Sequence, residues 1–215
     1  MTTNLPAENQ PPSQPATIDP GFGIAAQAFW EKNRQLVLMV CIASLLVVIG
    51  REGWQYYSEQ HELSVRNDYA KVADRPEQLA AFAGANAGHA LAGVAYLRIA
   101  DTKYAAGDFR SAAENYPKAA ASLNNPALLG RAKIGAAMSQ INSGDKTAGE
   151  TALKAVGAEA ALPKSIRAEA LYHLATLAYD SANAAEVSRL VTEVGKIDAA
   201  GIWSQRATLL LTIKP

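Results

Sequence analysis

The sequence has almost no cysteine: Cys41 is the only one among 215 residues. One cysteine cannot form an intramolecular disulfide and cannot supply the several thiolates of a structural zinc site. The three histidines lie far apart in the sequence, at His61, His89 and His173. The sequence therefore predicts no metal centre and no cofactor.

Sequence motifs of catalysis are also missing. No serine lies in a G-x-S-x-G pattern. The glycine-rich stretch GANAG, residues 84–88, has neither the lysine nor the preceding strand of a phosphate-binding loop. We find no candidate catalytic residue, and we expect a protein that is not an enzyme and has no small-molecule substrate.

A net charge of one sign is absent as well. Lys and Arg together number 20, Asp and Glu also number 20, and the basic residues form no local cluster. A surface without a net field or a basic patch does not attract nucleic acid. Aromatic residues make up only 7% of the chain, whereas alanine supplies 44 residues. Because alanine is the best helix former, this composition predicts an all-α fold.

The chain begins with a proline-rich segment. Residues 1–23 hold five of the ten prolines and show no apolar periodicity. Such a segment cannot bury enough apolar surface to offset the entropy lost when it is ordered. We therefore predict a disordered tail over residues 1–28.

An apolar run follows the tail. Leu36 to Gly50 carry no charge, but these 15 residues would span roughly 22 Å as a helix, less than the ~30 Å hydrocarbon core of a bilayer. Aromatic side chains flank the run on both sides, and two arginines can reach toward water and lengthen the apolar section. Segment 29–57 is thus predicted to be a membrane anchor with these interface residues: Phe29, Trp30, Arg34, Arg51, Trp54, Tyr56 and Tyr57.

Segment 29–57 has two other interpretations, a buried helix of a soluble domain and a cleaved signal peptide. A buried helix of a soluble domain can have a similar length, so it stays open. A cleaved signal peptide fits poorly, because the preceding segment is long and proline-rich and no A-x-A-like site follows. Lys32 and Arg34 precede the run and Arg51 alone closely follows it. The positive-inside rule then predicts a single-pass protein with a cytoplasmic N-terminus and its C-terminal part across the membrane.

Residues 58–88 are predicted to form linking helices. The helix of the anchor can continue to about residue 74, and the pair Arg75-Pro76 should break it, because proline disfavours the helical conformation of the residue before it. A short helix should follow and end in the glycine-containing stretch 84–88.

From residue 89 to residue 215 the sequence repeats itself. Three segments align on the turn positions Gly107, Gly144 and Ala182, which are 37 and 38 residues apart; the segments are 93–126, 130–163 and 168–198. A fixed spacing of this kind is typical of stacked helix pairs, in which each pair buries its apolar face against the next. Pro117 falls inside the second helix of the first segment and should kink it, since proline has no backbone N–H to donate.

The first segment resembles the tetratricopeptide repeat. It has small and large residues where this repeat packs its two helices, together with a Gly-Asp-Phe turn: Tyr96, Ala100, Gly107, Asp108, Phe109, Ala112, Tyr116, Ala119 and Pro126. The second and third segments keep fewer of these positions. The resemblance implies about three tetratricopeptide-like helix pairs over residues 89–215, behind a single N-terminal transmembrane helix.

The whole arrangement resembles the bacterial YfgM-like proteins, which are ancillary subunits of the Sec translocon. The resemblance rests on an aromatic, basic and apolar span, a linking helix and degenerate repeats; the span reads FWEKNRQLVLMVCIASLLVVIGREGWQYY. It implies a protein of the bacterial inner membrane with its repeats in the periplasm. The implied partners are the translocon and a membrane-anchored periplasmic chaperone of the peptidyl-prolyl isomerase type.

In such a stack the first helix of each pair lines a concave face. Residues at steps of three and four share one side of a helix, which predicts these partner-binding residues: Leu97, Asp101, Tyr104, Ile134, Met138, Ile141, Tyr172, Thr176 and Tyr179. One interpretation is an open groove for a segment of a protein partner. The other is that these residues are core, or that the C-terminal stretch IWSQRATLLLTI, residues 202–213, fills the groove.

Together these features favour a non-enzymatic, membrane-anchored scaffold for protein–protein interactions, and the resemblance adds a role in protein export and folding. An alternative is an assembly module of another cell-envelope complex. A third hypothesis is a protein whose repeats act in the cytosol.

Overall fold

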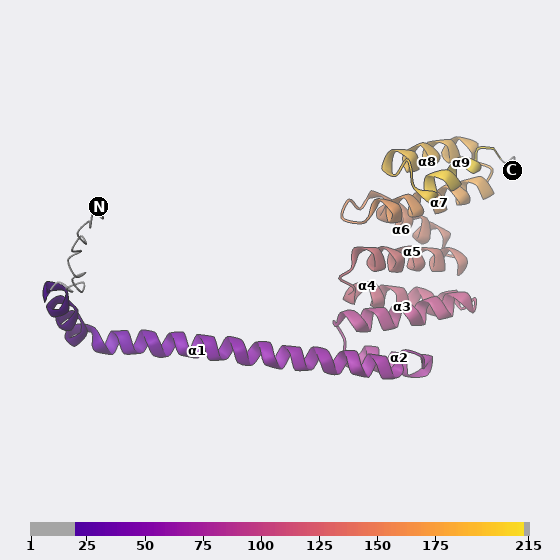
Figure 1. Cartoon of the computed structure of the whole chain (residues 1–215). Helices are drawn as coiled ribbons and strands as arrows, with labels where there is room; N and C mark the ends of the chain where they lie inside the picture. The colour runs from indigo at the N-terminus through magenta and orange to yellow at the C-terminus, as the bar shows by residue number, and fades with distance from the viewer. Residues whose placement is uncertain (1–19, 213–215) are drawn as a thin grey trace, which may run out of the picture. The chain divides into compact units, whose positions relative to one another are not determined.

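The computed structural model describes residues 20–212, and within this range all regular structure is α-helical, in nine helices (Figure 1). The predicted all-α fold is confirmed. The chain divides into two compact units, Met1–Gln60 and His61–Pro215, and the division falls within the first helix.

Helix α1, Pro20–Val72, begins inside the segment that was predicted to be disordered. Residues 1–19 lie outside the described residues, whereas residues 20–28 are helical, contrary to the prediction. The fixed backbone angle of proline suits the first position of a helix, and Ala25, Ala26 and Ala28 are strong helix formers. The proline count masked this short stretch of helix-forming residues.

Within α1, the section Gly23–Val72 contains a window that is long and apolar enough to cross a membrane, with a mean hydropathy of 2.1. None of this window is buried by other parts of the described chain. A core helix of a soluble domain buries its apolar side chains. The exposure of this window therefore favours the predicted membrane anchor over a buried helix of a soluble domain.

From His61 onward, the linking segment belongs to the same compact unit as the repeats. As expected, α1 ends just before Arg75-Pro76, and a short helix, α2 (Pro76–Ala85), follows. Val65 at the end of α1 packs with Leu79 and Phe82 of α2 and with alanines of the next helix. The ring centroids of Tyr69 and Phe82 lie 5.5 Å apart. These helices therefore form a packed entry to the stack.

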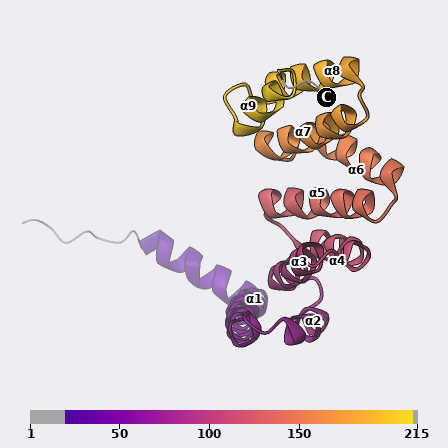
Figure 2. The same ribbon diagram turned by 90° about the vertical axis from the view of Figure 1, so that its right-hand side faces the viewer.

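Three helix pairs and a final short helix follow, as the repeat pattern predicts, and they stack in chain order (Figures 1 and 2). The first helix of a pair is called helix A here and the second helix B. The pairs are α3 (Ala90–Ala105) with α4 (Phe109–Ser122), α5 (Pro126–Asn142) with α6 (Lys146–Ala158), and α7 (Lys164–Asp180) with α8 (Ala184–Ile197); the last helix is α9 (Ile202–Leu209).

Each pair turns through the same hydrogen-bonded motif. The predicted turn residues all have positive φ: Gly107 at 78°, Gly144 at 105° and Ala182 at 55°. After α7, the N–H of Ala182 donates to the carbonyl of Tyr179 and the N–H of Asn183 donates to that of Ala178, each at 2.9 Å. This is the Schellman arrangement, which satisfies carbonyls at the end of a helix.

The residue after each turn position also begins helix B. The side chains of Asp108, Asp145 and Asn183 accept a hydrogen bond from the backbone N–H three residues later, each at 3.2 Å. This is the geometry of an N-cap, which satisfies a backbone donor that the helix itself cannot bond. Two adjacent residues thus end one helix and start the next.

Small residues let helices A and B approach closely. A Cβ added to Gly93 of α3 would lie 2.9 Å from Cγ of Leu123, and one added to Gly149 would lie 2.5 Å from the carbonyl oxygen of Ala137. Alanines that are fully buried occupy the other crossing positions, including Ala100, Ala112, Ala119 and Ala137. Alanine and glycine are therefore needed here because the facing backbones leave no room for a longer side chain.

Pro117 lies in the interior of α4, where a kink was expected. The helix nevertheless continues as one α-helix from Phe109 to Ser122. The missing N–H of Pro117 therefore does not end the helix, and the kink itself stays a prediction.

Ala182 is the one residue other than glycine with positive φ in residues 20–212, so its turn is strained. We expect Ala182→Gly to raise the free energy of unfolding by about 1 kcal/mol, because only glycine adopts this conformation without a steric cost. Gly144→Ala should lower it by a similar amount. Urea denaturation followed by circular dichroism would measure both.

The matched control is Ala106→Gly, at a turn residue whose φ is −79°. There glycine should destabilise slightly, because it only adds freedom to the unfolded chain. Equal effects of the two Ala→Gly changes would contradict the account of the turn.

Candidate partner-binding surface

The nine predicted partner-binding residues lie on the A helices α3, α5 and α7, but they differ in burial. Leu97 and Ile134 are each 5% exposed and belong to the hydrophobic core. They are therefore not available to a partner, since the faces that they occupy are covered by neighbouring helices. The remaining seven are partly exposed, and we call them the A-helix surface: Asp101, Tyr104, Met138, Ile141, Tyr172, Thr176 and Tyr179.

Asp101 is engaged in a polar network that joins the first two helix pairs. The Tyr116 hydroxyl of α4 donates to one of its carboxylate oxygens at 2.9 Å, and Arg131 of α5 donates to the other at 2.7 Å. Burial, together with the bond to Asp101, raises the pKa of Tyr116, so this hydroxyl stays a donor. Asp101 thus fixes α4 and α5 against α3.

The row of equivalent positions Tyr104, Ile141 and Tyr179 is held by packing. The Tyr104 hydroxyl accepts a hydrogen bond from the Asn142 amide at 2.8 Å, and its ring lies edge-on to that of Phe109 at 5.1 Å. Ile141 and Tyr179 pack against the core of the second and third pairs. The row is therefore ordered in advance of any binding, which lowers the entropy cost of binding.

The C-terminal helix covers only part of this surface. The Trp203 ring of α9 lies 5.2 Å from that of Tyr172 and 6.0 Å from that of His173, and the Arg206 guanidinium lies 4.7 Å from the centre of the Trp203 ring. Within the described residues, α9 packs on α7 and α8. It caps the stack and covers Tyr172, but it does not reach α3 or α5.

Two titratable groups of α7 lie beside this cap. Burial lowers the pKa of His173 and raises the pKa of Glu169, although the guanidinium groups of Arg131 and Arg206 oppose the latter shift. Nε2 of His173 is 4.0 Å from Oε1 of Glu169. The side chains of His173 and Glu169 are 23% and 27% exposed, so both are largely buried.

Sequence reasoning missed Arg131 and Glu169. A signal for both exists, because Glu169 follows Arg131 by the 38 residues that separate the turns Gly144 and Ala182. Opposite charges at equivalent positions of neighbouring A helices indicate a contact along the stack. Trp203 lies in the stretch 202–213 that was predicted as a possible occupant of the groove, and its ring covers Tyr172 of α7.

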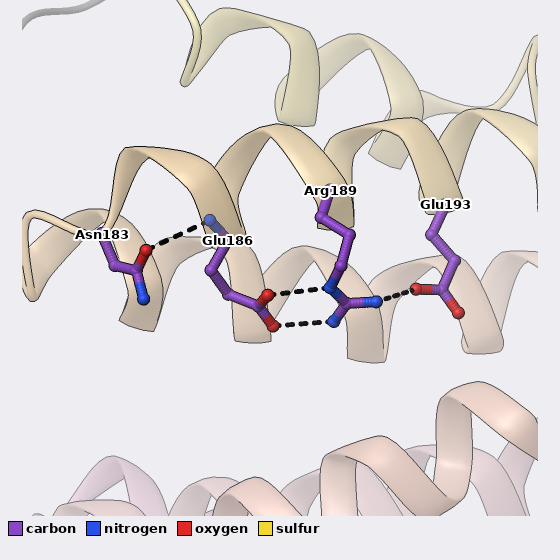
Figure 3. Close-up of polar contacts among 4 residues, drawn as sticks. All are labelled: Asn183, Glu186, Arg189 and Glu193. Atoms are coloured by element: carbon purple, nitrogen blue, oxygen red, sulfur yellow. Dashed lines mark hydrogen bonds and ion pairs between the residues drawn. The ribbon is translucent and has the colours of Figure 1, made fainter.

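The outer face of α8 carries a different polar network (Figure 3). Arg189 donates to both carboxylate oxygens of Glu186, at 2.7 and 2.8 Å, and to Glu193 at 2.9 Å, while Asn183 caps the helix. These residues are neighbours along one helix, and pairs of this kind stabilise a solvated helix face only weakly. We assign this network a structural role.

The predicted membrane-interface residues are all exposed, and they lie at both ends of the apolar section of α1. Trp30 is 52% exposed and Trp54 is 73% exposed. Such residues bury their rings at the level of the lipid headgroups when a helix crosses a bilayer.

A family model described as the tetratricopeptide repeat-like domain matches residues 27–162. The chain belongs to this family. The match begins with the apolar helix and runs through α6, so the pair α7–α8 extends the same helix-pair geometry beyond it. Searches of curated proteins and of solved structures each found no match.

Tetratricopeptide repeat-like domains are typically non-enzymatic modules for protein–protein interaction, and this assignment suggests protein partners for the chain. Among residues 20–212 no group of three or more His, Cys, Asp or Glu side chains is arranged to hold a metal ion. The A-helix surface combines aromatic, aliphatic and hydroxyl groups, and its role in binding a partner stays a prediction.

The network around Asp101 predicts the effect of removing one hydroxyl. Tyr116→Phe should lower the free energy of unfolding by about 1.5 kcal/mol, because a buried donor to a carboxylate is lost while the ring remains. Tyr96→Phe is the matched control, since it removes a hydroxyl from the partly exposed Tyr96 of α3, whose ring faces Lys118. Urea denaturation of both variants would measure the difference, and equal stabilities would contradict the role of the network.

Burial of His173 predicts a dependence of stability on pH. Because its pKa is lowered in the folded protein, the unfolded chain binds more protons as the pH falls below about 6.5, and stability is lost in that direction. His173→Gln should therefore lose less melting temperature between about pH 7.5 and about pH 5.5 than the parent protein. Glu169 is present in both proteins, so its opposite shift cancels in the comparison.

The control is Thr176→Ala, a substitution on the same helix that removes no titratable group. This variant should follow the parent protein over the same range. If His173→Gln did so too, His173 would not be buried as described.

Proposed function

We propose that this protein is a non-enzymatic scaffold that is held at a membrane by one transmembrane helix and binds protein partners through its A-helix surface. One observation carries the proposal. A single family match covers both an apolar helix with a fully exposed window and the helix pairs that follow it. A helix whose apolar side chains are left uncovered needs lipid around it, and a stack of helix pairs offers surfaces for binding.

The exposed parts of the A helices support a binding role. Met138 and Thr176 are partly exposed on α5 and α7, and Tyr104 adds an aromatic ring from α3. Such rows on successive A helices can contact an elongated partner segment along the stack. The row Tyr104, Ile141 and Tyr179 packs into the core and is therefore rigid. On binding, most of the conformational entropy would be lost by the partner segment and little by this row.

The location and the partners rest on the charge pattern around the apolar run and on the resemblance of the sequence to a known family. One more basic residue precedes the apolar run than closely follows it, which favours a cytoplasmic N-terminus and repeats in the periplasm. The resemblance to YfgM-like proteins supports the bacterial inner membrane as the location. It also supports the Sec translocon and a membrane-anchored periplasmic chaperone as partners, with a role in protein export and folding.

Site-specific photocrosslinking in intact cells would test the proposal. A photoreactive residue at Met138 or at Thr176 should form adducts with translocon subunits or with the chaperone, identified by antibodies against them. Thr192, an exposed threonine on the outer face of α8, is the matched control and should give none. Adducts with other envelope proteins would favour the alternative assembly module, and no adducts would contradict a partner at this surface.

The same cells test the topology. Trypsin added to spheroplasts should digest the repeat unit, because trypsin reaches only periplasmic segments. If the repeats were digested only after the inner membrane was lysed, the periplasmic location would be wrong and the cytosolic hypothesis would hold.

A further inference from the structure

Glu169 of α7 lies beside the A-helix surface, since Tyr172 and Thr176 follow it by three and seven residues and share its side of the helix. Its side chain is 27% exposed, so the carboxylate is largely buried but still within reach of a partner. Among residues 20–212, no lysine or arginine nitrogen lies within 4.0 Å of this carboxylate, and no group donates a hydrogen bond to it. A desolvated carboxylate in this state costs free energy until a donor reaches it.

The charged groups around Glu169 are engaged elsewhere or neutral. Nε2 of His173 is 4.0 Å from Oε1 of Glu169, but burial lowers the pKa of His173, so this ring is neutral at about pH 7. Arg131 donates to Asp101 at 2.7 Å, and the Arg206 guanidinium stacks on an aromatic ring of its own helix. Both guanidinium groups attract Glu169 from a distance, yet burial outweighs this attraction and raises the pKa of the carboxyl group.

The preceding repeat shows which group is missing. Between α3 and α5, Arg131 forms an ion pair with Asp101. The residues that follow Asp101 and Arg131 by the spacings of the turn positions, 37 and 38, are Met138 and Glu169. Between α5 and α7 a carboxylate therefore meets a thioether where the preceding repeat has two opposite charges. Glu169 is one half of an ion pair whose other half this position of α5 does not supply.

We propose that the protein segment bound along the A-helix surface carries a lysine or arginine side chain that pairs with Glu169 between α5 and α7. The inference deepens the proposed function and rests on it. Charge complementarity selects the cation, because an acidic side chain would be repelled by Glu169 and a neutral one would leave its charge unpaired. Met138 and Tyr172 can pack on the aliphatic stem of such a side chain, and an aromatic ring attracts a cation.

Glu169→Gln separates a binding role from a structural one. Burial raises the pKa of Glu169 in the folded protein, so above this pKa the charge disfavours folding, and its removal should raise the melting temperature at about pH 7.5. Asp101→Asn is the comparison, because it weakens the bonds from Tyr116 and Arg131 and should lower the melting temperature. If both variants lowered it equally, Glu169 would serve the fold and the proposal would be overturned.

NMR of the full chain in lipid nanodiscs tests the cation directly. The chain has three methionines, Met1, Met39 and Met138, so labelling of the methionine methyl groups with ¹³C gives few signals. The signal of Met138 is identified by its loss in Met138→Leu. The probes are the N-acetyl N-methylamides of arginine, of the neutral analogue citrulline and of glutamate. The arginine probe should shift the Met138 signal and bind at least about fivefold more tightly than the citrulline probe, while the Met39 signal stays unchanged.

The matched variants locate the charge. Glu169→Gln keeps the size of the side chain and removes its charge, so it should weaken binding of the arginine probe about fivefold and leave the citrulline probe unaffected. The control Glu114→Gln removes an exposed carboxylate from α4 and should bind as the parent protein does.

Several results would overturn the proposal: no shift with the arginine probe, equal affinities for arginine and citrulline, or no effect of Glu169→Gln. Tighter binding of the glutamate probe would also overturn it and would assign the surface to an acidic segment, held by Arg131 and Arg206. The failure of the proposed function is distinguishable. Absence of crosslinks from Met138 and Thr176 would contradict the partner surface, whereas loss of the preference for arginine would contradict the cation site alone.

Discussion

Close contact between helix backbones is the constraint on which the rest of the repeat unit depends. Gly93 against the end of α4, and Gly149 against Ala137, leave no space even for a methyl group. Where the backbones approach this closely, the large residues beside them, such as Tyr116 and Leu153, are forced into defined positions and are buried. The alanine-rich composition is thus a requirement of packing. The same close packing fixes the positions of the side chains on the surface of the stack.

The repeated turn carries this order from one pair to the next. Because the same two adjacent residues end helix A and begin helix B, each pair leaves the turn in the same way, and equivalent positions recur along the stack. Arg131 of α5 and Glu169 of α7, for example, occupy equivalent positions on neighbouring A helices. Departures from the repeat are then meaningful: alanine at positions 136 and 152, where the next repeat has leucine, leaves a space that the regular pattern would close.

The two units solve different problems of solvation. The repeat unit covers its own apolar groups, through three core clusters that run from the end of α1 to α9. The apolar section of α1 is not covered by the rest of the described chain, and as a candidate membrane span it would make its contacts with lipid hydrocarbon instead. A helix satisfies its backbone hydrogen bonds internally, so a single helix of this kind would be able to enter a bilayer without partner helices.

The sequence by itself determined the helical class, the three pairs and all three turn positions, because these depend on local propensities and on a fixed spacing that can be read along the chain. It also located the apolar helix, although proline content hid the start of α1 at Pro20. Only the tertiary structure decided that Leu97 and Ile134 are core, that Asp101 holds Tyr116 and Arg131, and that Trp203 covers Tyr172. These contacts join residues on different helices, and helical periodicity defines a face without stating what lies against it.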